Sequence, residues 1–266
     1  MKVIDLEELK IIQIEILDEV HNFCLEKGIT YFLSSGTLIG AIRHRGYIPW
    51  DDDIDLYMPR KDYERFLKIF NQISENCRVL SLSTDKKYAL AYAKVERLGT
   101  RMIEHVDNPM EMGVNIDVFP IDGVPDSETE RERYFAKIQR KRNALTLKDV
   151  SIRRGRNVLK NAALVLGKVV LLPYSLRSLA EKLDSIVDKT NTDSKYVCNV
   201  VLGNGIKSIF SREAILNSVD IEFEGKMYKT MAGYDEYLTK TYGDYMKLPP
   251  EEKRLSHHKF TAYLTE

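Results

Sequence analysis

The sequence contains few cysteines and no closely spaced pair of them. Cys24, Cys77 and Cys198 are far apart among the 266 residues, and none belongs to a CxxC motif. A disulfide framework and a cysteine-based zinc site are therefore not expected, and a reducing compartment fits this composition. Cys24 lies within an apolar pattern of helical period, so we expect it to serve packing.

The sequence also lacks an excess of either charge and any long apolar run. Lys and Arg together number 40, as do Asp and Glu. Because nucleic-acid-binding proteins usually carry a basic excess, no nucleic-acid partner is expected. No stretch is apolar for long enough to span a bilayer. Asp5, Glu7 and Glu8 stand where a signal peptide would need a basic region and then an apolar core, so we expect a cytoplasmic protein.

One segment, residues 34–60 (SSGTLIGAIRHRGYIPWDDDIDLYMPR), concentrates unusual chemistry. Four of five successive positions in it are aspartates, namely Asp51, Asp52, Asp53 and Asp55. They run into an apolar stretch, residues 54–58, which reads as a strand. A solvated acidic turn is the plain alternative, but it would not need four carboxylates, whose mutual repulsion costs energy unless a cation relieves it. The cluster therefore favours a bound cation.

Asp53 and Asp55 form the central pair of this cluster. Alternate residues of a strand point to the same side, about 6.5–7 Å apart along the chain. Two such carboxylates can hold one or two hard cations, and Mg²⁺ prefers one or two carboxylates together with phosphate oxygens. Asp51 is expected to join them, whereas Asp52 is expected to point away as a turn or cap residue. The expected chemistry is metal-assisted transfer of a phosphorus-containing group.

Asp117 is a carboxylate within an otherwise apolar strand pattern, residues 113–119. An unpaired buried charge is costly, so pairing with a lysine is the ordinary explanation. The functional alternative is a third metal ligand or a general base on a neighbouring strand. Asp122 is the fallback candidate, although we expect a turn there, because Pro120, Gly123 and Pro125 should end the strand.

Residues near the start of the first segment are candidates for phosphate binding. Gly36 lets the backbone approach a phosphate closely, and the amides that open the following short helix can donate to it. Ser35 and Thr37 offer hydroxyl donors. Arg43, with His44 and Arg45 beside it, could hold a diphosphate or could simply complement the helix dipole.

Four later residues are weaker candidates for the donor site. Lys94 and Arg97 come from a strand candidate at residues 89–98, and the alternative for both is a solvated face. His257 and His258 stand near the C-terminus. Adjacent histidines point in different directions, so a surface role is the alternative for them.

The order of elements indicates an α+β fold, with a mixed β-sheet core flanked by helices. Helices are expected at residues 6–27, ended by Gly28, and at residues 128–148, opened by a capping box of Ser127 and Glu130. A hairpin is expected at residues 219–230. We divide the chain into a catalytic core, residues 1–126, and a mostly helical portion, residues 127–266, that packs back on it.

The basic and apolar segment at residues 153–177 has two interpretations. It could form a buried core helix, or it could lie in a bilayer interface beside anionic lipids. The second interpretation predicts contact with the inner face of the membrane.

Three motifs together resemble the LicD family, whose members transfer phosphocholine and related phospho-alcohols, and the nucleotidyltransferase fold. They are GTLIGAIRHRGYIPWDDDIDLYMPRKDYERF from Gly36, GVNIDVFPIDGVPD around Asp117, and YGDYMKLPPEEKRLSHH from Tyr242. Their positions at the front, middle and end imply that the resemblance covers nearly the whole chain. It is least visible between residues 127 and 218, where acceptor recognition is expected.

The resemblance implies an enzyme that takes phosphocholine from CDP-choline, or a related group from another CDP-alcohol. It would pass the group to a sugar hydroxyl of a cell-surface glycan precursor, such as teichoic acid or lipopolysaccharide, and release CMP. The acceptor is expected to be lipid-linked, and the cofactor to be Mg²⁺ or Mn²⁺. Asp53 and Asp55 match the family's metal-binding acids, with Asp51 beside them, and Asp117 matches the acid of the second motif. The third motif places His257 or His258 near the site.

Two other functions remain open from the sequence. A protein of the same fold could transfer a nucleotide from an NTP to the hydroxyl of a small molecule, by attack at the α-phosphorus. A non-catalytic, membrane-associated assembly factor would instead draw on the basic and apolar segment at residues 153–177.

Overall fold

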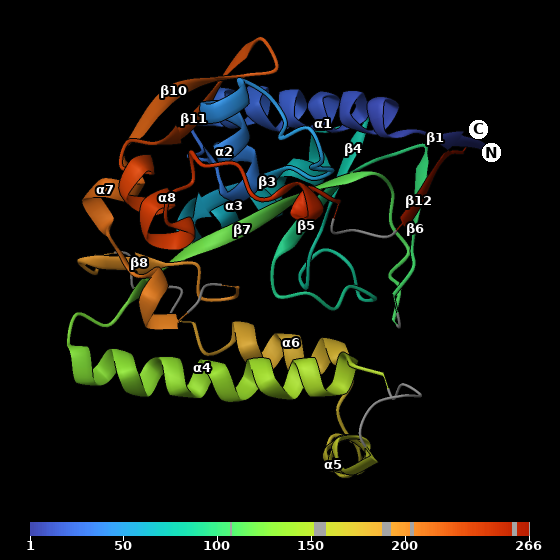
Figure 1. Cartoon of the computed structure of the whole chain (residues 1–266), viewed down its shortest axis with the longest axis vertical. Helices are drawn as coiled ribbons and strands as arrows, with labels where there is room; N and C mark the ends of the chain where they lie inside the picture. The colour runs from blue at the N-terminus through green and yellow to red at the C-terminus, as the bar shows by residue number, and fades with distance from the viewer. Residues whose placement is uncertain (107, 152–157, 188–192, 203–204, 257–259, 266) are drawn as a thin grey trace.

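The computed structural model describes the chain except residues 107, 152–157, 188–192, 203–204, 257–259 and 266. A mixed β-sheet lies between helices, with α1 on one side and α4 and α6 on the other (Figure 1), which confirms the α+β prediction. Its strands follow the order β2-β3-β7-β5-β4, in which β3 and β7 are parallel. Their bounds are Phe32–Leu33 for β2, Asp55–Pro59 for β3, Asn115–Val124 for β7, Ala93–Arg97 for β5 and Cys77–Leu80 for β4.

Strand alternation gives the sheet an apolar face and a polar face. In β3, Leu56 and Met58 are fully buried, whereas Asp55 and Tyr57 remain partly accessible. Ile54, Leu56 and Met58 belong to the main core with residues of α1 (Leu6–Lys27) and α3 (Arg60–Ile69). The opposite face of β3 is thus available for chemistry.

Helix α1 begins and ends as its sequence predicts. The Asp5 side chain accepts a hydrogen bond of 2.8 Å from the backbone N–H of Glu8, which satisfies one of the free amides of the first turn. At the other end Gly28 has a φ of 59°, a left-handed conformation that glycine adopts without steric cost. The predicted helix at residues 6–27 and its stop at Gly28 are confirmed.

Strand β7 continues through Pro120 and Gly123 to Val124, so the predicted break after residue 119 is wrong. The pairing with β5 ends at Val118, and the pairing with β8 (Tyr196–Cys198) begins at Asp122. Pro120 lies between these two stretches, where β3 is the neighbouring strand. The missing N–H of proline is tolerated at such an edge position.

Asp122 is not a turn residue, as the sequence suggested, but a buried member of β7. Its side chain accepts two hydrogen bonds from Arg60, at 2.5 Å from Nε and 3.1 Å from Nη2. Arg60 also contacts Glu64 and Asp184, so α3, β7 and α6 (Leu176–Asp184) meet at one guanidinium group. The bidentate geometry fixes both side chains.

The helical segment after β7 consists of α4 (Glu128–Asp149), α5 (Val158–Val170) and α6. The predicted helix at residues 128–148 is confirmed, but its capping box is wrong, since the Ser127 side chain makes no capping hydrogen bond. Arg131 instead donates to the carbonyl oxygens of Pro125 and Asp126, at 3.1 and 2.7 Å. The guanidinium group therefore holds the chain at the start of the helix.

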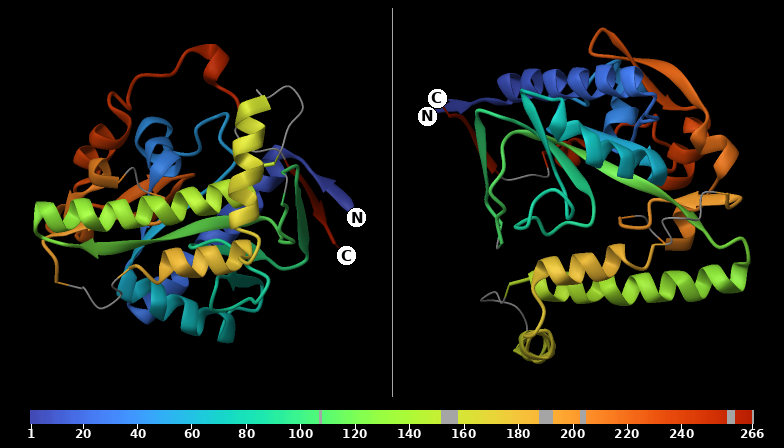
Figure 2. Two further views of the ribbon diagram at one scale, coloured as in Figure 1. Left: turned by 90° about the horizontal axis from the view of Figure 1, so that it is seen from below. Right: turned by 180° about the vertical axis from the view of Figure 1, so that it is seen from behind.

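The rest of the chain returns to the core. Strand β12 pairs with β1 and β6, so the last strand of the described chain lies beside the first (Figure 2). The hairpin of β10 and β11 is confirmed, and Thr230 donates to the carbonyl oxygen of Leu33 in β2, at 3.0 Å.

Division of the chain at residue 126 stays a prediction. The bounds of the remaining elements are Lys2–Ile4 for β1, Ser35–His44 for α2, Thr100–Glu104 for β6, Phe210–Ser211 for β9, Arg212–Leu216 for α7, Ser218–Phe223 for β10, Lys226–Met231 for β11, Tyr234–Tyr242 for α8 and Phe260–Leu264 for β12.

The ion pair of Arg60 with Asp122 generates a stability prediction. Asp122→Asn should lower the free energy of unfolding by about 3 kcal/mol, because it leaves a buried guanidinium group without its main counter-charge. A double variant, Arg60→Leu with Asp122→Leu, should recover most of that loss. Asp220→Asn, which removes an exposed ion pair with Lys229, is the control and should cost less than about 1 kcal/mol. Urea unfolding measures all three, and equal losses for Asp122→Asn and the control would contradict the prediction.

Candidate active site

Three charged side chains form a row across three neighbouring strands. Asp55 of β3 is paired in register with Asp117 of β7, and Asp117 is paired with Lys94 of β5. Directly paired residues on adjacent strands project to the same face of a sheet. The row therefore brings together residues that are far apart in the sequence.

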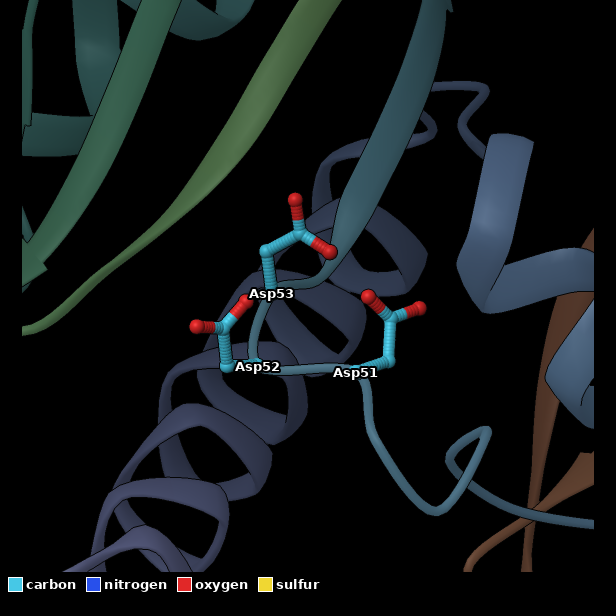
Figure 3. A group of neighbouring side chains, drawn as sticks. All are labelled: Asp51, Asp52 and Asp53. Atoms are coloured by element: carbon cyan, nitrogen blue, oxygen red, sulfur yellow. The ribbon is translucent and has the colours of Figure 1, made fainter. Parts of the chain in front are cut away.

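Three further carboxylates lie in the loop that leads into β3. Figure 3 shows Asp51, Asp52 and Asp53 around one bend of the chain, and one ligand oxygen from each lies within 4.8 Å of the others. The expectation that Asp52 points away from the group is wrong, because β3 begins only at Asp55 and strand alternation does not extend to these residues. Asp52 is 5% exposed and accepts a hydrogen bond from the Ser256 hydroxyl.

The electrostatics of this group favour protonation or a bound cation. Burial raises the pKa of Asp51 to about 7, and the negative charge of Asp53 adds to the shift. Burial likewise raises the pKa of Asp55 well above its ordinary value, and the negative charges of Asp53 and Asp117 raise it further. A hydrogen bond with the Ser35 side chain acts in the opposite direction. Burial and neighbouring negative charges thus make ionisation of Asp51 and of Asp55 more costly.

Lys94 lies against this row and is 9% exposed, so its predicted solvated alternative is wrong. Its ammonium group forms an ion pair with Asp117 and donates to the side-chain oxygen of Asn115 at 3.1 Å. Asp117 therefore has the lysine partner that the ordinary explanation required, and it also lies beside Asp55. Pairing with Lys94 and a place in the acidic group are compatible.

The start of α2 packs directly against the acidic residues. A Cβ atom on Gly36 would lie 2.7 Å from Oδ2 of Asp51, so only glycine permits this approach. Ser35 has a φ of 50°, an uncommon left-handed conformation for a residue with a side chain. The Thr37 hydroxyl accepts a hydrogen bond of 2.9 Å from the backbone N–H of Asp55 and so fixes the start of β3.

Two predicted phosphate-binding residues are not brought to the acidic group. Arg43 lies in the last turn of α2, where it donates to the carbonyl oxygen of Tyr245 at 2.9 Å. Arg97 is three residues from Lys94 in β5, so the two side chains project to opposite faces of the sheet. His257 and His258 lie outside the described residues.

Residues of the acidic row line two cavities. One, of about 250 Å³, is lined by Asp53, Asp117 and Lys94 together with polar residues that include Gln13 and His105; we call it the polar cavity. The other, also of about 250 Å³, contains Asp55 and Ser35 at one end and several aromatic side chains; we call it the aromatic cavity. The site therefore has two cavities of different chemistry, each lined by at least one of its carboxylates.

The aromatic residues are the part of the site that sequence reasoning missed. Tyr57 follows Asp55 by two residues, and Phe119 follows Asp117 by two, so strand alternation puts each on the face of its acid. Their rings are 6.1 Å apart at 89°. The same alternation that paired the acids could have identified them.

The donor set fits a divalent metal ion. Asp51, Asp53, Asp55 and Asp117 offer hard carboxylate oxygens, the ligands that Mg²⁺ prefers. Burial first, and then the negative charges of neighbouring acids, raise the pKa of Asp51 and of Asp55, and a bound cation would relieve both costs. These four residues could hold such an ion together with a phosphate group.

The contact between Gly36 and Asp51 predicts a selective loss. Gly36→Ala should displace the Asp51 carboxylate and reduce the rise in melting temperature that Mg²⁺ produces. The unfolding free energy without cation should stay the same or rise by up to about 1 kcal/mol, since alanine favours helix over glycine. Scanning calorimetry with and without Mg²⁺ measures both quantities. An unchanged Mg²⁺ effect would show that the position of Asp51 does not matter for cation binding.

The chain is similar to known proteins over nearly its whole length. Residues 28–148 match the family model described as LicD/FKTN/FKRP, nucleotidyltransferase domain. The lipopolysaccharide cholinephosphotransferase LicD of Haemophilus influenzae is 33% identical over 274 residues, which cover 99% of this chain and 100% of that protein. Uncharacterized proteins of Rickettsia typhi and Rickettsia prowazekii are 36% and 34% identical over 61 residues, 23% of this chain and 20% and 23% of those proteins. The chain therefore belongs to the LicD family, as its three motifs indicate.

Proposed function

We propose that the protein transfers phosphocholine, or a closely related phospho-alcohol, from a CDP-activated donor to a sugar hydroxyl of a cell-surface glycan precursor. The observation that carries this proposal is the group of Asp51, Asp52 and Asp53 at the entry to β3, where Asp55 is paired in register with Asp117 and these acids contribute to the lining of two cavities. The full-length similarity to a lipopolysaccharide cholinephosphotransferase supports the choice of phosphocholine and of a lipopolysaccharide-like acceptor.

The reaction requires one bond to form and one to break at the same phosphorus. The acceptor hydroxyl oxygen attacks the β-phosphorus of the CDP-alcohol, the bond from that phosphorus to the bridging oxygen breaks, and CMP leaves. Mg²⁺ or Mn²⁺ held by Asp53 and Asp55 would supply charge neutralisation for the diphosphate. Catalysis then rests mainly on positioning and electrostatic stabilisation, as in other phosphoryl transfers.

The remaining residues of the site have separate roles in this proposal. Asp117 completes the cation site, and it faces the polar cavity, where it can accept the proton of the attacking hydroxyl. Lys94 holds Asp117 in place and lies where it can contact the departing phosphate. Gln13 of α1 donates to the backbone oxygens of Asp52 and Asn115, at 2.9 and 3.2 Å, and so joins the acidic loop to β7.

We also propose that α5 contacts a lipid surface, which would bring the site to a lipid-linked acceptor. Leu159, Leu166 and Val170 follow a helical spacing along one side of α5, and their exposed fractions are 79%, 68% and 74%. Within the described chain, no helix is long and apolar enough to cross a membrane. An apolar helix face of this kind is suited to lie in a bilayer interface. Leu166→Ser should therefore weaken sedimentation of the protein with anionic lipid vesicles, whereas Ile11→Ser, at an exposed apolar position of α1, should not.

Substitution of single carboxylates tests the proposed reaction. With CDP-choline, Mg²⁺ and a lipopolysaccharide acceptor, Asp53→Asn and Asp117→Asn should each slow CMP release at least about 100-fold, the loss typical of removing one electrostatic contribution to a transition state. Asp220→Asn, on the exposed hairpin, should leave the rate unchanged.

The products of the same assay discriminate between the functions left open by the sequence. A nucleotidylated product from an NTP, without CMP from CDP-choline, would support nucleotide transfer to a small molecule instead. Unchanged cellular function in both carboxylate variants would support a non-catalytic assembly factor.

The raised pKa of Asp51 predicts how stability depends on pH. The pKa of this carboxyl is about 7 in the folded protein and, as for a free Asp, about 3.9 when unfolded, so the folded state binds the proton more tightly. Without divalent cations, stability should fall as pH rises from about 4 through about 7. Added Mg²⁺ should raise the melting temperature more at pH 8 than at pH 5. Asp51→Asn should flatten the pH dependence of stability. An Mg²⁺ effect on the wild-type melting temperature that is equal at both pH values would contradict the prediction.

A further inference from the structure

The aromatic cavity is built from rings on four different elements, β3, β7, β9 and α8. Tyr57 and Phe119 come from the sheet, Phe210 from β9, and Tyr237 and Tyr242 from α8. Of the residues that line this cavity, the proposed transfer uses only Asp55. The five aromatic residues therefore need an explanation of their own.

The rings are set at steep angles to one another. Tyr57 makes an angle of 89° with Phe119 and 68° with Tyr237, and Tyr237 makes an angle of 66° with Phe210. Such angles orient neighbouring rings like adjacent walls of a box rather than like a stack. A box of aromatic walls is the arrangement that recognises a quaternary ammonium group, since the electron-rich face of each ring attracts the cation.

The charges around the two cavities differ. The residues that line the aromatic cavity include one acid, Asp55, and no lysine, arginine or histidine among those that the structure describes. The polar cavity is lined by Lys94 and His105 and also by four acids, Asp52, Asp53, Glu104 and Asp117. A phosphate that arrives with a divalent cation suits this lining, whereas the aromatic side suits a cationic or neutral group that needs no metal ion.

The aromatic cavity is connected to the acidic row by the strands and by hydrogen bonds. Tyr57 is one strand step of about 6.5–7 Å beyond Asp55. The Tyr237 hydroxyl accepts from the backbone N–H of Ser35 and donates to the Tyr57 hydroxyl, both at 3.3 Å. The buried Thr241 hydroxyl has no hydrogen-bond partner among the described residues and can donate to a ligand oxygen. A group bound beside Asp55 through its phosphorus would extend into the aromatic cavity across a short linker.

We propose that the aromatic cavity binds the trimethylammonium group of a phosphocholine donor, with Tyr57, Phe119, Tyr237 and Tyr242 as its walls, while the nucleotide side lies in the polar cavity. This inference rests on the proposed phospho-alcohol transfer and assigns the subsite that binds the alcohol part of the donor. It assigns Tyr242, whose residue is 46% exposed, to the mouth of the cavity.

Direct binding tests the proposal without relying on turnover. Isothermal titration of the full chain with Mg²⁺ compares phosphocholine with 3,3-dimethylbutyl phosphate, in which a neutral carbon replaces the quaternary nitrogen. Wild-type protein should bind phosphocholine about tenfold more tightly, the ratio expected for a desolvated cation–π contact. Tyr242→Leu should remove most of that preference, whereas Tyr242→Phe, which keeps the ring, should retain it. Tyr174→Leu, at a comparably exposed tyrosine, is the matched control and should change nothing.

The outcomes separate this inference from the proposed reaction. Phosphocholine binding that depends on Tyr242, without CMP release from CDP-choline, would uphold the cavity assignment and reject the reaction. Equal binding of the neutral analogue, or full phosphocholine binding by Tyr242→Leu, would overturn the assignment, even if CMP were released from another CDP-alcohol. If Tyr242→Leu weakened the binding of a free hexose and left phosphocholine binding unaffected, the assignment would be overturned in favour of a sugar site.

Discussion

The mutual repulsion of carboxylates confined at the start of β3 is the constraint on which the rest of the structure depends. Gly36 lacks a side chain where Asp51 approaches α2, Thr37 fixes the backbone of Asp55, and Lys94 pairs with Asp117. These contacts hold the acids in place without cancelling their charge, since burial and neighbouring acids still raise the pKa of Asp51 and of Asp55. Binding of a cation with an attached diphosphate would relieve this repulsion and so stabilise the site.

The same strand alternation creates both the core and the site. Leu56 and Met58 anchor β3 in the main core, and Asp55 and Tyr57 consequently face the cavities. Strand β7 repeats this arrangement with Asp117 and Phe119 one strand away. Because acids and aromatic rings occupy successive steps on one rigid face, reactive and recognition groups keep a fixed spacing, which the proposed transfer of a short phospho-alcohol requires.

Local sequence patterns predicted the parts of the molecule that depend on local physics. Helix α1, its glycine stop and the β10–β11 hairpin follow from periodicity and turn chemistry. The acidic group was predictable because repulsion among Asp51, Asp52, Asp53 and Asp55 is visible in five successive residues. The continuation of β7 through Pro120, the burial of Asp122 against Arg60 and the separation of Arg43 from the site were not, since each depends on which distant element packs alongside. Lys94 was predictable only in part. A lysine on a strand suggested phosphate contact, but its pairing with Asp117 was needed to exclude a solvated role.

In the proposed reaction, Asp53 and Asp55 jointly ligate a divalent cation beside the diphosphate of the donor. Anomalous diffraction from crystals soaked with Mn²⁺ and CDP-choline would locate that cation. We expect a single strong peak, or a close pair, with carboxylate oxygens of both residues about 2.0–2.3 Å away and a diphosphate oxygen on the same ion. Donor bound at the site without a Mn²⁺ peak there, or a peak that neither Asp53 nor Asp55 contacts, would contradict this expectation.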